Sequence, residues 1–343
     1  MNGTGNDATR PLGSVRWSVL DRALIRRGQQ PAEALRETVR FAQQAEALGY
    51  HRFWVAEHHA VPGVAGSAPT VLAAAVPAAT SRIRVGTGGV MLPNHRPLVV
   101  AEQFGVLESL FPGRIDMGLG RSVGFTAAVR RALGADKEAA EGFAAQLTEL
   151  LGYFGEGAPG AVRAVPSRGL RVPAFVLAVG AGAETAASLG LPLVMAHLAD
   201  EDRMRGALDR YREAFRPSPH GARPYVVLAA NVAVASTRER ARLLQLPEAW
   251  ATAYSRTRGV FPPLDPPGEV AARELTDRER TYIGQARASH IHGTPGEVRA
   301  TLGRLLARTG ADEVLVTLNT HDPGDRLDSY ALLADLAGLP GRA

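Results

Sequence analysis

The chain contains no cysteine in its 343 residues. This absence excludes disulfide bonds, thiolate metal sites and a cysteine nucleophile, although it leaves the compartment open. Lysine is almost absent as well, because Lys137 is the only one, and nearly all positive charge comes from arginine. The arginines are scattered among acidic residues, as in residues 31–49, and form no basic stripe with interleaved aromatic residues. We therefore expect no nucleic-acid partner.

Long apolar runs are missing too. No apolar segment approaches the roughly 20 residues that a membrane-spanning helix needs. The opening MNGTGNDATRPLGS is polar and glycine-rich and lacks the apolar core of a signal peptide. We expect a cytoplasmic protein without membrane contact, with a flexible N-terminal tail over residues 1–13. The composition, 45% hydrophobic and 21% charged, is typical of a globular protein.

Strand-like and helix-like segments alternate from end to end. The expected strands are VRWSVL, RFWVAEH, IRVGTGGVML, RIDMGLG, AFVLAVG, LPLVMAH, YVVLAANVAVAS and DEVLVTLNT. The segments between them have apolar residues at helical spacing, including a long helical stretch from Thr126 to about Phe154. Eight strands that each precede a helix predict an α/β fold, a (β/α)8 TIM barrel formed as one domain over residues 14–340.

One segment departs from this alternation. The proline-rich residues around Phe261 to Pro267 are expected to form an irregular insertion before the last strand. Loops of this length without regular structure are often active-site lids.

In such barrels the chemistry lies where the strands end, because all eight carboxyl ends meet at one rim. Polar residues and glycines follow most of the predicted strands. They are Glu57, His58 and His59 after the second strand, Gly88, Gly89, Asn94 and His95 after the third, Arg121 after the fourth, Gly180 to Gly182 after the fifth and His197 after the sixth. We expect these residues to converge on one site.

The run Glu57-His58-His59 has three possible interpretations from its residues alone: metal ligands, a catalytic base with its support, or satisfied interior polar groups. Adjacent side chains on a strand point in opposite directions, and the i, i+4 spacing of a helical zinc site is absent. His95, His197 and His292 could reach the same rim, but nothing in the sequence forces them together. We therefore predict no metal site, and the other two interpretations stay open.

Several segments together resemble the bacterial-luciferase-like flavin-dependent monooxygenases. The segments that resemble the family are FWVAEHH, RIRVGTGGVMLPNHRPLVVAEQFGVLESLFPGRIDMGLGR, GLPLVMAH and HGTPGEV. They occur in the family's order and at its usual separations, and the resemblance extends from about Val15 to Leu336. The resemblance implies a (β/α)8 barrel with an insertion before the last strand. It also implies reduced FMN as a co-substrate, delivered by a separate NAD(P)H-dependent flavin reductase, and molecular oxygen that oxidises a small or medium organic substrate. A homodimer, in contact through helices of the first half of the chain, is expected as well.

The same resemblance assigns roles to individual residues. His58 manages proton transfer beside the flavin, for which an imidazole is suited because its ordinary pKa lies near neutrality. His59 supports it. A non-proline cis peptide bond under the flavin ring falls at Gly88-Gly89, and Arg121 meets the cofactor phosphate together with the turn of Gly180, Ala181 and Gly182. Asn94 is assigned to the cofactor-binding set.

Two features depart from the family pattern. Relatives place serine or threonine hydroxyls in the turn after the fifth strand, where this chain has Val179 to Ala183 without a hydroxyl. The loop after the first strand carries Arg22, Arg26 and Arg27, which would suit an anionic or polar substrate. Two alternatives therefore stand beside the monooxygenase: a 5-deazaflavin-dependent hydride-transfer oxidoreductase, and a non-catalytic flavin-binding or ligand-binding barrel.

Overall fold

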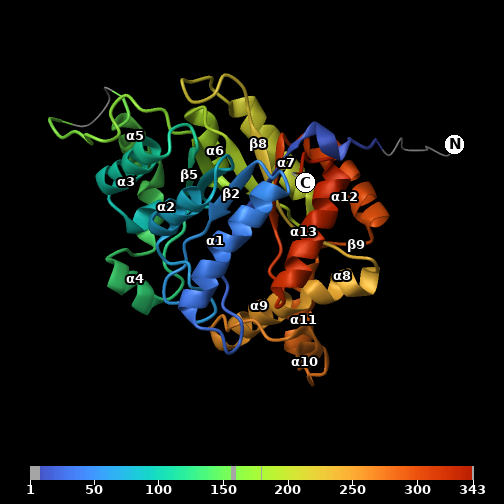
Figure 1. Ribbon diagram of the computed structural model, residues 1–343. Coiled ribbons are helices and arrows are strands. Elements are labelled where there is room, and N and C mark those ends of the chain that lie inside the picture. The colour runs from blue at the N-terminus through green and yellow to red at the C-terminus, as the bar shows by residue number, and fades with distance from the viewer. Residues whose placement is uncertain (1–7, 156–159, 179, 342–343) are drawn as a thin grey trace.

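The computed structural model describes residues 8–155, 160–178 and 180–341. All of its long strands are parallel and form one closed barrel (Figure 1). The strands are β1 (Arg16–Asp21), β2 (Arg52–Val55), β3 (Arg84–Thr87), β4 (Val90–Met91), β5 (Ile115–Gly120), β6 (Ala174–Leu177), β7 (Leu193–Ala196), β8 (Val226–Val234), β9 (Ile291–Gly293) and β10 (Glu313–Thr317). The barrel closes because β10 pairs with both β1 and β8.

Eight strand positions surround the axis, as the sequence predicts. Strands β3 and β4 both pair with β5 and together occupy one position, interrupted at Gly88-Gly89. The short β9 pairs in parallel with the last three residues of β8 and was not predicted. The (β/α)8 fold expected from the alternation of segments is therefore confirmed.

Helices surround the barrel and follow its strands. They are α1 (Pro31–Ala47), α2 (Pro69–Ala79), α3 (Pro97–Leu110), α4 (Ala127–Leu133), α5 (Phe143–Gly152), α6 (Ala181–Ser188), α7 (Glu201–Ala214), α8 (Arg238–Leu244), α9 (Leu246–Arg258), α10 (Pro267–Ala271), α11 (Asp277–Arg287), α12 (Pro295–Thr309) and α13 (Pro323–Ala337). Short 3-10 turns are η1 (Leu12–Ser14), η2 (Leu92–Asn94) and η3 (Glu138–Gly142). Within the described residues, no helix is both long and apolar enough to span a membrane.

The strands are buried on both faces, which explains their almost continuous apolar sequences. Trp54, Phe175 and Leu315 form part of a cluster inside the barrel. Their chain neighbours, such as Phe53 and Val176, point outward and pack in the larger core beneath the helices. This alternation is the period-two geometry of a strand.

Buried charges close the barrel at the amino ends of its strands. The Arg52 guanidinium lies 2.5 Å from Asp116 and 3.1 Å from Glu313, and Arg84 lies 2.7 Å from Asp116. The acids are fully buried and each has a partner, as buried charges require. This network stands at the end of the barrel opposite the rim, so we interpret it as structural.

The prediction of one long helical stretch from Thr126 to about Phe154 is wrong. The structure divides this stretch into α4, η3 and α5. Helix α4 ends at Gly134, whose φ of 68° is left-handed and closes the helix with bonds to Arg130 and Arg131. Glycine is favoured at this position because it has no Cβ to clash there.

The predicted insertion before the last strand is present and contains more structure than expected. Residues 259–266 are irregular between α9 and α10, whereas the sequence reading missed α11 altogether. Figure 1 shows α9, α10 and α11 at the same lower end of the molecule as α4. The insertion therefore covers the end of the barrel where the candidate site lies.

The N-terminal tail was expected over residues 1–13, of which residues 1–7 lie outside the described part. Residues 8–13 lie against the barrel. The Arg10 amide donates to Gly303 and its guanidinium donates to Ala311 at 2.7 Å, while Leu12 is buried and accepts a bond from the Trp17 indole. The described part of this segment is thus packed, because an apolar side chain and two arginine contacts hold it.

Candidate active site

Glu57 follows the end of β2 and connects two loops of the rim. Its carboxylate oxygen Oε1 lies 2.6 Å from His59 Nε2 and 2.8 Å from His95 Nε2, and Oε2 accepts the Met91 amide at 2.8 Å. Burial by itself would raise the pKa of this carboxyl, but the hydrogen bonds from His95, His59 and the amide outweigh it and lower the pKa. Glu57 is therefore an ionised acceptor that joins the loop after β2 to the loop after β4.

These three side chains form the one group of metal-ligand spacing among the described residues, with ligand atoms within 4.8 Å of one another. The expected strand RFWVAEH extended through His58, but β2 ends at Val55 and Glu57, His58 and His59 lie in a loop. His59 therefore reaches the same oxygen as His95. Both nitrogen–oxygen distances are those of hydrogen bonds, and we interpret the group as a hydrogen-bonded support.

His58 is separate from this group and lines a cavity of about 370 Å³. Its ring stacks against that of Phe125 at 6.0 Å and 14°, and its buried Nδ1 atom has no hydrogen-bond partner in the described residues. Burial, and next the positive charge of Arg22, lower the pKa of His58 to about 4. The imidazole is consequently neutral near pH 7 and free to exchange a proton with a ligand.

The rest of this cavity is mainly apolar. Its walls come from the loops after β1, β2 and β5, from α4 and α9, and from the start of the insertion. Besides His58 and Phe125, they include Val61, Val64, Val129, Val260 and Phe261, with Arg22, Thr126, Thr252 and Ser255 as polar members. Its volume lies within the range of small-molecule sites.

A cis peptide bond joins Gly88 to Gly89, at the position that the resemblance assigned. Both glycines lie where a side chain would collide with the barrel. A Cβ on Gly88 would come within 2.5 Å of Leu20, and one on Gly89 within 2.8 Å of the Gly118 carbonyl. The backbone at this step is thus a surface without side chains, at the top of the barrel.

Arg121 follows β5 and makes no hydrogen bond or ion pair with the described part of the chain. Its Cδ atom lies 3.7 Å from the position that a Cβ on Gly182 would take, beside the first turn of α6. A free guanidinium and the amides of a helix N-terminus are both anion-binding groups. Gly180 precedes this helix with a φ of 81°, whereas Val179 lies outside the described residues and the side chain of Ala181 is not described.

The other polar candidates occupy separate positions. Asn94, in η2, has a buried amide whose Nδ2 and Oδ1 atoms have no partner among the described residues. The Nδ1 atom of His197 lies 2.8 Å from the Ser289 carbonyl oxygen, and His292 is on β9. His95, His197 and His292 therefore do not meet.

The three arginines of the first loop are paired, which the sequence did not predict. Arg22 contacts Glu248, and Arg26 lies 2.5 Å from Glu37. Arg27 lies 3.1 Å from Asp265 and contacts Glu269. The suggestion that they attract an anionic substrate is thus not supported, since every one of them has an acidic partner.

The same loop is bound to the insertion through its backbone. Ile25 donates to Gly63, Gly63 donates to Phe261, and Leu264 donates back to Ile25, at 2.8–3.0 Å. Two isolated bridges, Leu24 with Val64 and Arg26 with Leu264, complete the connection. These bonds hold the insertion over the cavity that contains His58.

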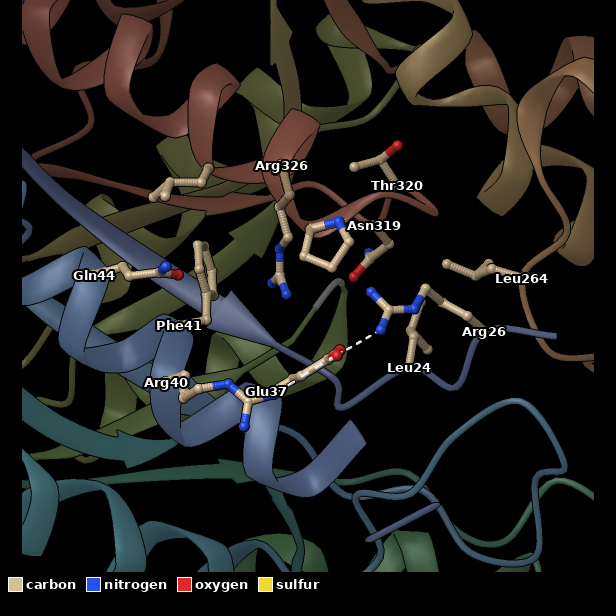
Figure 2. Close-up of a pocket in the computed structure, with 13 residues that line it drawn as sticks. Leu24, Arg26, Glu37, Arg40, Phe41, Gln44, Leu264, Asn319, Thr320 and Arg326 are labelled. Atoms are coloured by element: carbon tan, nitrogen blue, oxygen red, sulfur yellow. Dashed lines mark hydrogen bonds and ion pairs between the residues drawn. The ribbon is translucent and has the colours of Figure 1, made fainter. Parts of the chain in front are cut away.

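A second hollow, of about 200 Å³, lies between α1 and the start of α13. Figure 2 shows Arg26 extending toward Glu37 on α1, with Asn319 and Arg326 nearby. The Arg326 guanidinium lies 2.7 Å from Asp21. Because Arg26 and Arg326 are both engaged by acids, we do not assign a ligand to this hollow.

The polar residues that α9 contributes were not predicted from the sequence. Glu248, Thr252 and Ser255 lie on α9 at i, i+4 and i+7, and so share one face of that helix. This helical spacing of polar residues could have indicated a polar face in the sequence. Phe125 was missed as well, although it directly follows the Arg121 loop.

Known proteins resemble this chain in sequence over most of its length. Residues 16–314 match the sequence profile of the luciferase-like monooxygenases. The chain is 39% identical to the Bacillus subtilis protein YvbT, over 93% of this chain and 96% of that protein. It is 36% identical to a luciferase-like monooxygenase of Escherichia coli K12, over 94% and 97%, and 33% identical to an N-acetyl-S-alkylcysteine monooxygenase of Bacillus subtilis, over 94% and 98%.

Solved structures give the same result. The crystal structure of apo-MsnO8 superposes with a TM-score of 0.86 at 35% identity, covering 96% of this chain and all of that one. The oxygenating constituent of 3,6-diketocamphane monooxygenase from Pseudomonas putida, in complex with FMN, has a TM-score of 0.72 at 16% identity, covering 95% and 99%. An F420-dependent secondary alcohol dehydrogenase has a TM-score of 0.67 at 15% identity, covering 94% and 99%. On the match of its sequence over most of its length, the chain belongs to the luciferase-like monooxygenase family.

Proposed function

We propose that this protein is the oxygenating component of a flavin-dependent monooxygenase, which uses reduced FMN as a co-substrate and molecular oxygen to oxidise a small or medium organic molecule. Family membership makes an oxidoreductase the expected class of enzyme. Reduced FMN, when bound, supplies the electrons that activate oxygen. The observation that carries the proposal is the unpaired Arg121 beside the first turn of α6.

The residues fit a phosphorylated flavin. Among the described residues Arg121 has no acidic partner, and the α6 N-terminus offers backbone amides beside it, so the two together suit a phosphate. Gly182 lets the first turn of α6 pack closely against Ala178, because a Cβ there would lie 2.5 Å from that of Ala178. The side-chain-free surface at Gly88 and Gly89 suits the face of a flat ring. The buried, unpartnered amide of Asn94 is a further cofactor contact in this proposal.

His58 is the catalytic residue of this proposal, and His59 supports it. His58 lies in an apolar cavity that the insertion covers, where water is restricted. Its neutral imidazole and unpartnered Nδ1 atom allow it to hold or move a proton at the reacting group. His59 positions the loop through its bond to Glu57.

The test is anaerobic titration of the purified protein with reduced FMN, followed by mixing with oxygen and assay of candidate substrates. We expect saturable binding of reduced FMN and substrate-dependent product formation. Coenzyme F420, a 5-deazaflavin, is the comparator, because one structural neighbour uses it. Tighter binding of F420 with hydride transfer would replace the proposal by the deazaflavin alternative. Binding without turnover on any substrate would favour a non-catalytic barrel.

Two partners belong to this proposal. A separate NAD(P)H-dependent reductase supplies the reduced FMN, as expected for an oxygenating component. A second copy of the chain covers an apolar surface on α2 and α3. Val71 on α2 is 70% exposed, and Val99, Val106 and Leu110 on α3 are 47%, 46% and 64% exposed. Exposed apolar residues gathered on neighbouring helices are typical of protein interfaces.

A further inference from the structure

The cavity beside His58 contains a charge arrangement that bears on the substrate. Arg22 is the one arginine in its lining, and its partner Glu248 stands behind it, outside the lining. Glu248 is buried, with 8% of its surface exposed, and it also accepts bonds from Asn231 at 2.8 Å and Asn319 at 3.1 Å. The carboxylate is therefore fixed in position by neutral donors as well as by Arg22.

A second ion pair, between Asp21 and Arg326, lies next to the first. Asp21 precedes Arg22 and lies 2.7 Å from Arg326, whose guanidinium stands over the ring of Phe41 at 3.8 Å. Two arginines and two acids are thus packed together with no net charge. Figure 2 shows Asn319 and Arg326 in the lining of the second hollow. Burial, above all, lowers the pKa of Arg22 to about 10, so this arginine remains charged near pH 7.

We propose that the Arg22–Glu248 pair makes this cavity selective for an uncharged, mainly apolar substrate that carries a hydrogen-bond acceptor such as a carbonyl oxygen. This inference rests on the proposed function, since it names the substrate class of the same site. A carboxylate brought into the cavity would lose its water and find a guanidinium that Glu248 already neutralises. A neutral acceptor loses less on leaving water, and the N–H groups of Arg22 remain available to it.

The rest of the lining agrees with this substrate class. Thr252 and Ser255 offer hydroxyl groups from one face of α9, while Val61, Val260 and Phe261 supply apolar contact. His58 is neutral and adds no cation near pH 7. Helix α9, which leads directly into the insertion, supplies both Glu248 and the hydroxyl groups.

The experiment is calorimetric binding of three probes of matched shape: phenylbutanamide, phenylbutanoate and phenylbutylammonium. The protein is saturated with oxidised FMN, and turnover is not required. For the wild type we expect the amide to bind at least about tenfold more tightly than either ion, because burying an ion without a compensating charge is unfavourable. Equal or tighter binding of phenylbutanoate, or no binding of the amide, would overturn the inference.

Two variants test whether the charges of Arg22 and Glu248 cause this selectivity. Glu248→Gln keeps the shape but leaves Arg22 uncompensated, so phenylbutanoate should gain about tenfold or more while the amide changes little. The double variant Arg22→Gln with Glu248→Gln is neutral again and should restore discrimination against both ions. An unchanged preference in Glu248→Gln, or a gain in phenylbutanoate binding that persists in the double variant, would contradict the assignment. Melting temperature identifies a variant that fails to fold, and the wild-type comparison then decides alone.

Failure of the proposed function gives a different result. If FMN does not bind, the probe experiment is run without it, and selectivity for the amide still supports the inference. If reduced FMN supports turnover but charged and neutral substrates react equally well, the function stands and the substrate assignment fails.

Discussion

The Nε2 atom of His95 lies 2.8 Å from Oε1 of Glu57, although the two residues follow different strands of the barrel. The same carboxylate receives His59 and the Met91 amide. One buried acid thus fixes the loop that presents His58 relative to the segment that follows Gly89. The rim geometry depends on this contact.

Glu57→Gln should destabilise the fold. The amide has one acceptor oxygen where the carboxylate has two, so at least one buried donor loses its partner, at a cost of about 1–3 kcal/mol. Urea denaturation monitored by circular dichroism measures the change. Glu213→Gln on the exposed surface of α7 is the control and should change stability by less than about 0.5 kcal/mol. Equal stability of the two variants would mean that Glu57 does not hold the rim.

His58 should make stability depend on pH. Its pKa is about 4 in the fold, against an ordinary value of 6.5, so the unfolded chain takes up this proton first as pH falls. The stability associated with the neutral ring is complete above pH 6.5 and declines between pH 6.5 and 4, by up to about 3 kcal/mol. In His58→Gln the decline over this window should be smaller. Denaturation curves at several pH values measure it, and parallel curves for the two proteins would contradict the expectation.

Arg121→Met should weaken FMN binding with little effect on folding. The guanidinium has no partner to lose within the described residues, whereas hydrogen bonds to a charged group contribute about 1.5–3 kcal/mol, or roughly tenfold to a hundredfold in affinity. Fluorescence titration with FMN measures it. Arg131→Met, an exposed arginine on α4, is the matched control. Equal affinity in both variants would place the phosphate elsewhere.

Two glycines of β5 should differ sharply in their tolerance of alanine. A Cβ on Gly118 would lie 1.9 Å from the Thr87 carbonyl oxygen, while one on Gly120 meets only the Val90 oxygen, at 3.9 Å. Gly118→Ala should therefore cost about 1–3 kcal/mol or more, and Gly120→Ala much less. Melting temperatures of the pair decide this prediction, which fails if Gly120→Ala is the less stable variant.

Val106→Glu should prevent self-association through α2 and α3. Its side chain is 46% exposed on the face that Val99 and Leu110 share, so the variant would bring a carboxylate into the proposed apolar interface. Light scattering after size-exclusion chromatography should give a dimer for the wild type and a monomer for the variant. A monomeric wild type would refute the interface.

Much of the fold could be predicted because barrel strands are local and repetitive. The segment AFVLAVG is apolar throughout and DEVLVTLNT has an apolar centre, as expected of strands buried on both faces, and each is followed by a helical segment. The ends of helices and the short strands were harder to predict. Gly134 ends a helix that the apolar spacing on either side would have continued, and β9 is a three-residue strand whose existence depends on the end of β8.

The sequence by itself determined which residues stand at the rim, because a strand end is a local property and the carboxyl ends of parallel strands meet at one face. His58, Arg121 and the glycine pair Gly88-Gly89 were all located in this way. Only the tertiary structure decided their partners. Glu57 with His95, and Arg22 with Glu248, are contacts between segments far apart in the chain, and a charge that looks free in a sequence is neutralised only by what the fold brings beside it.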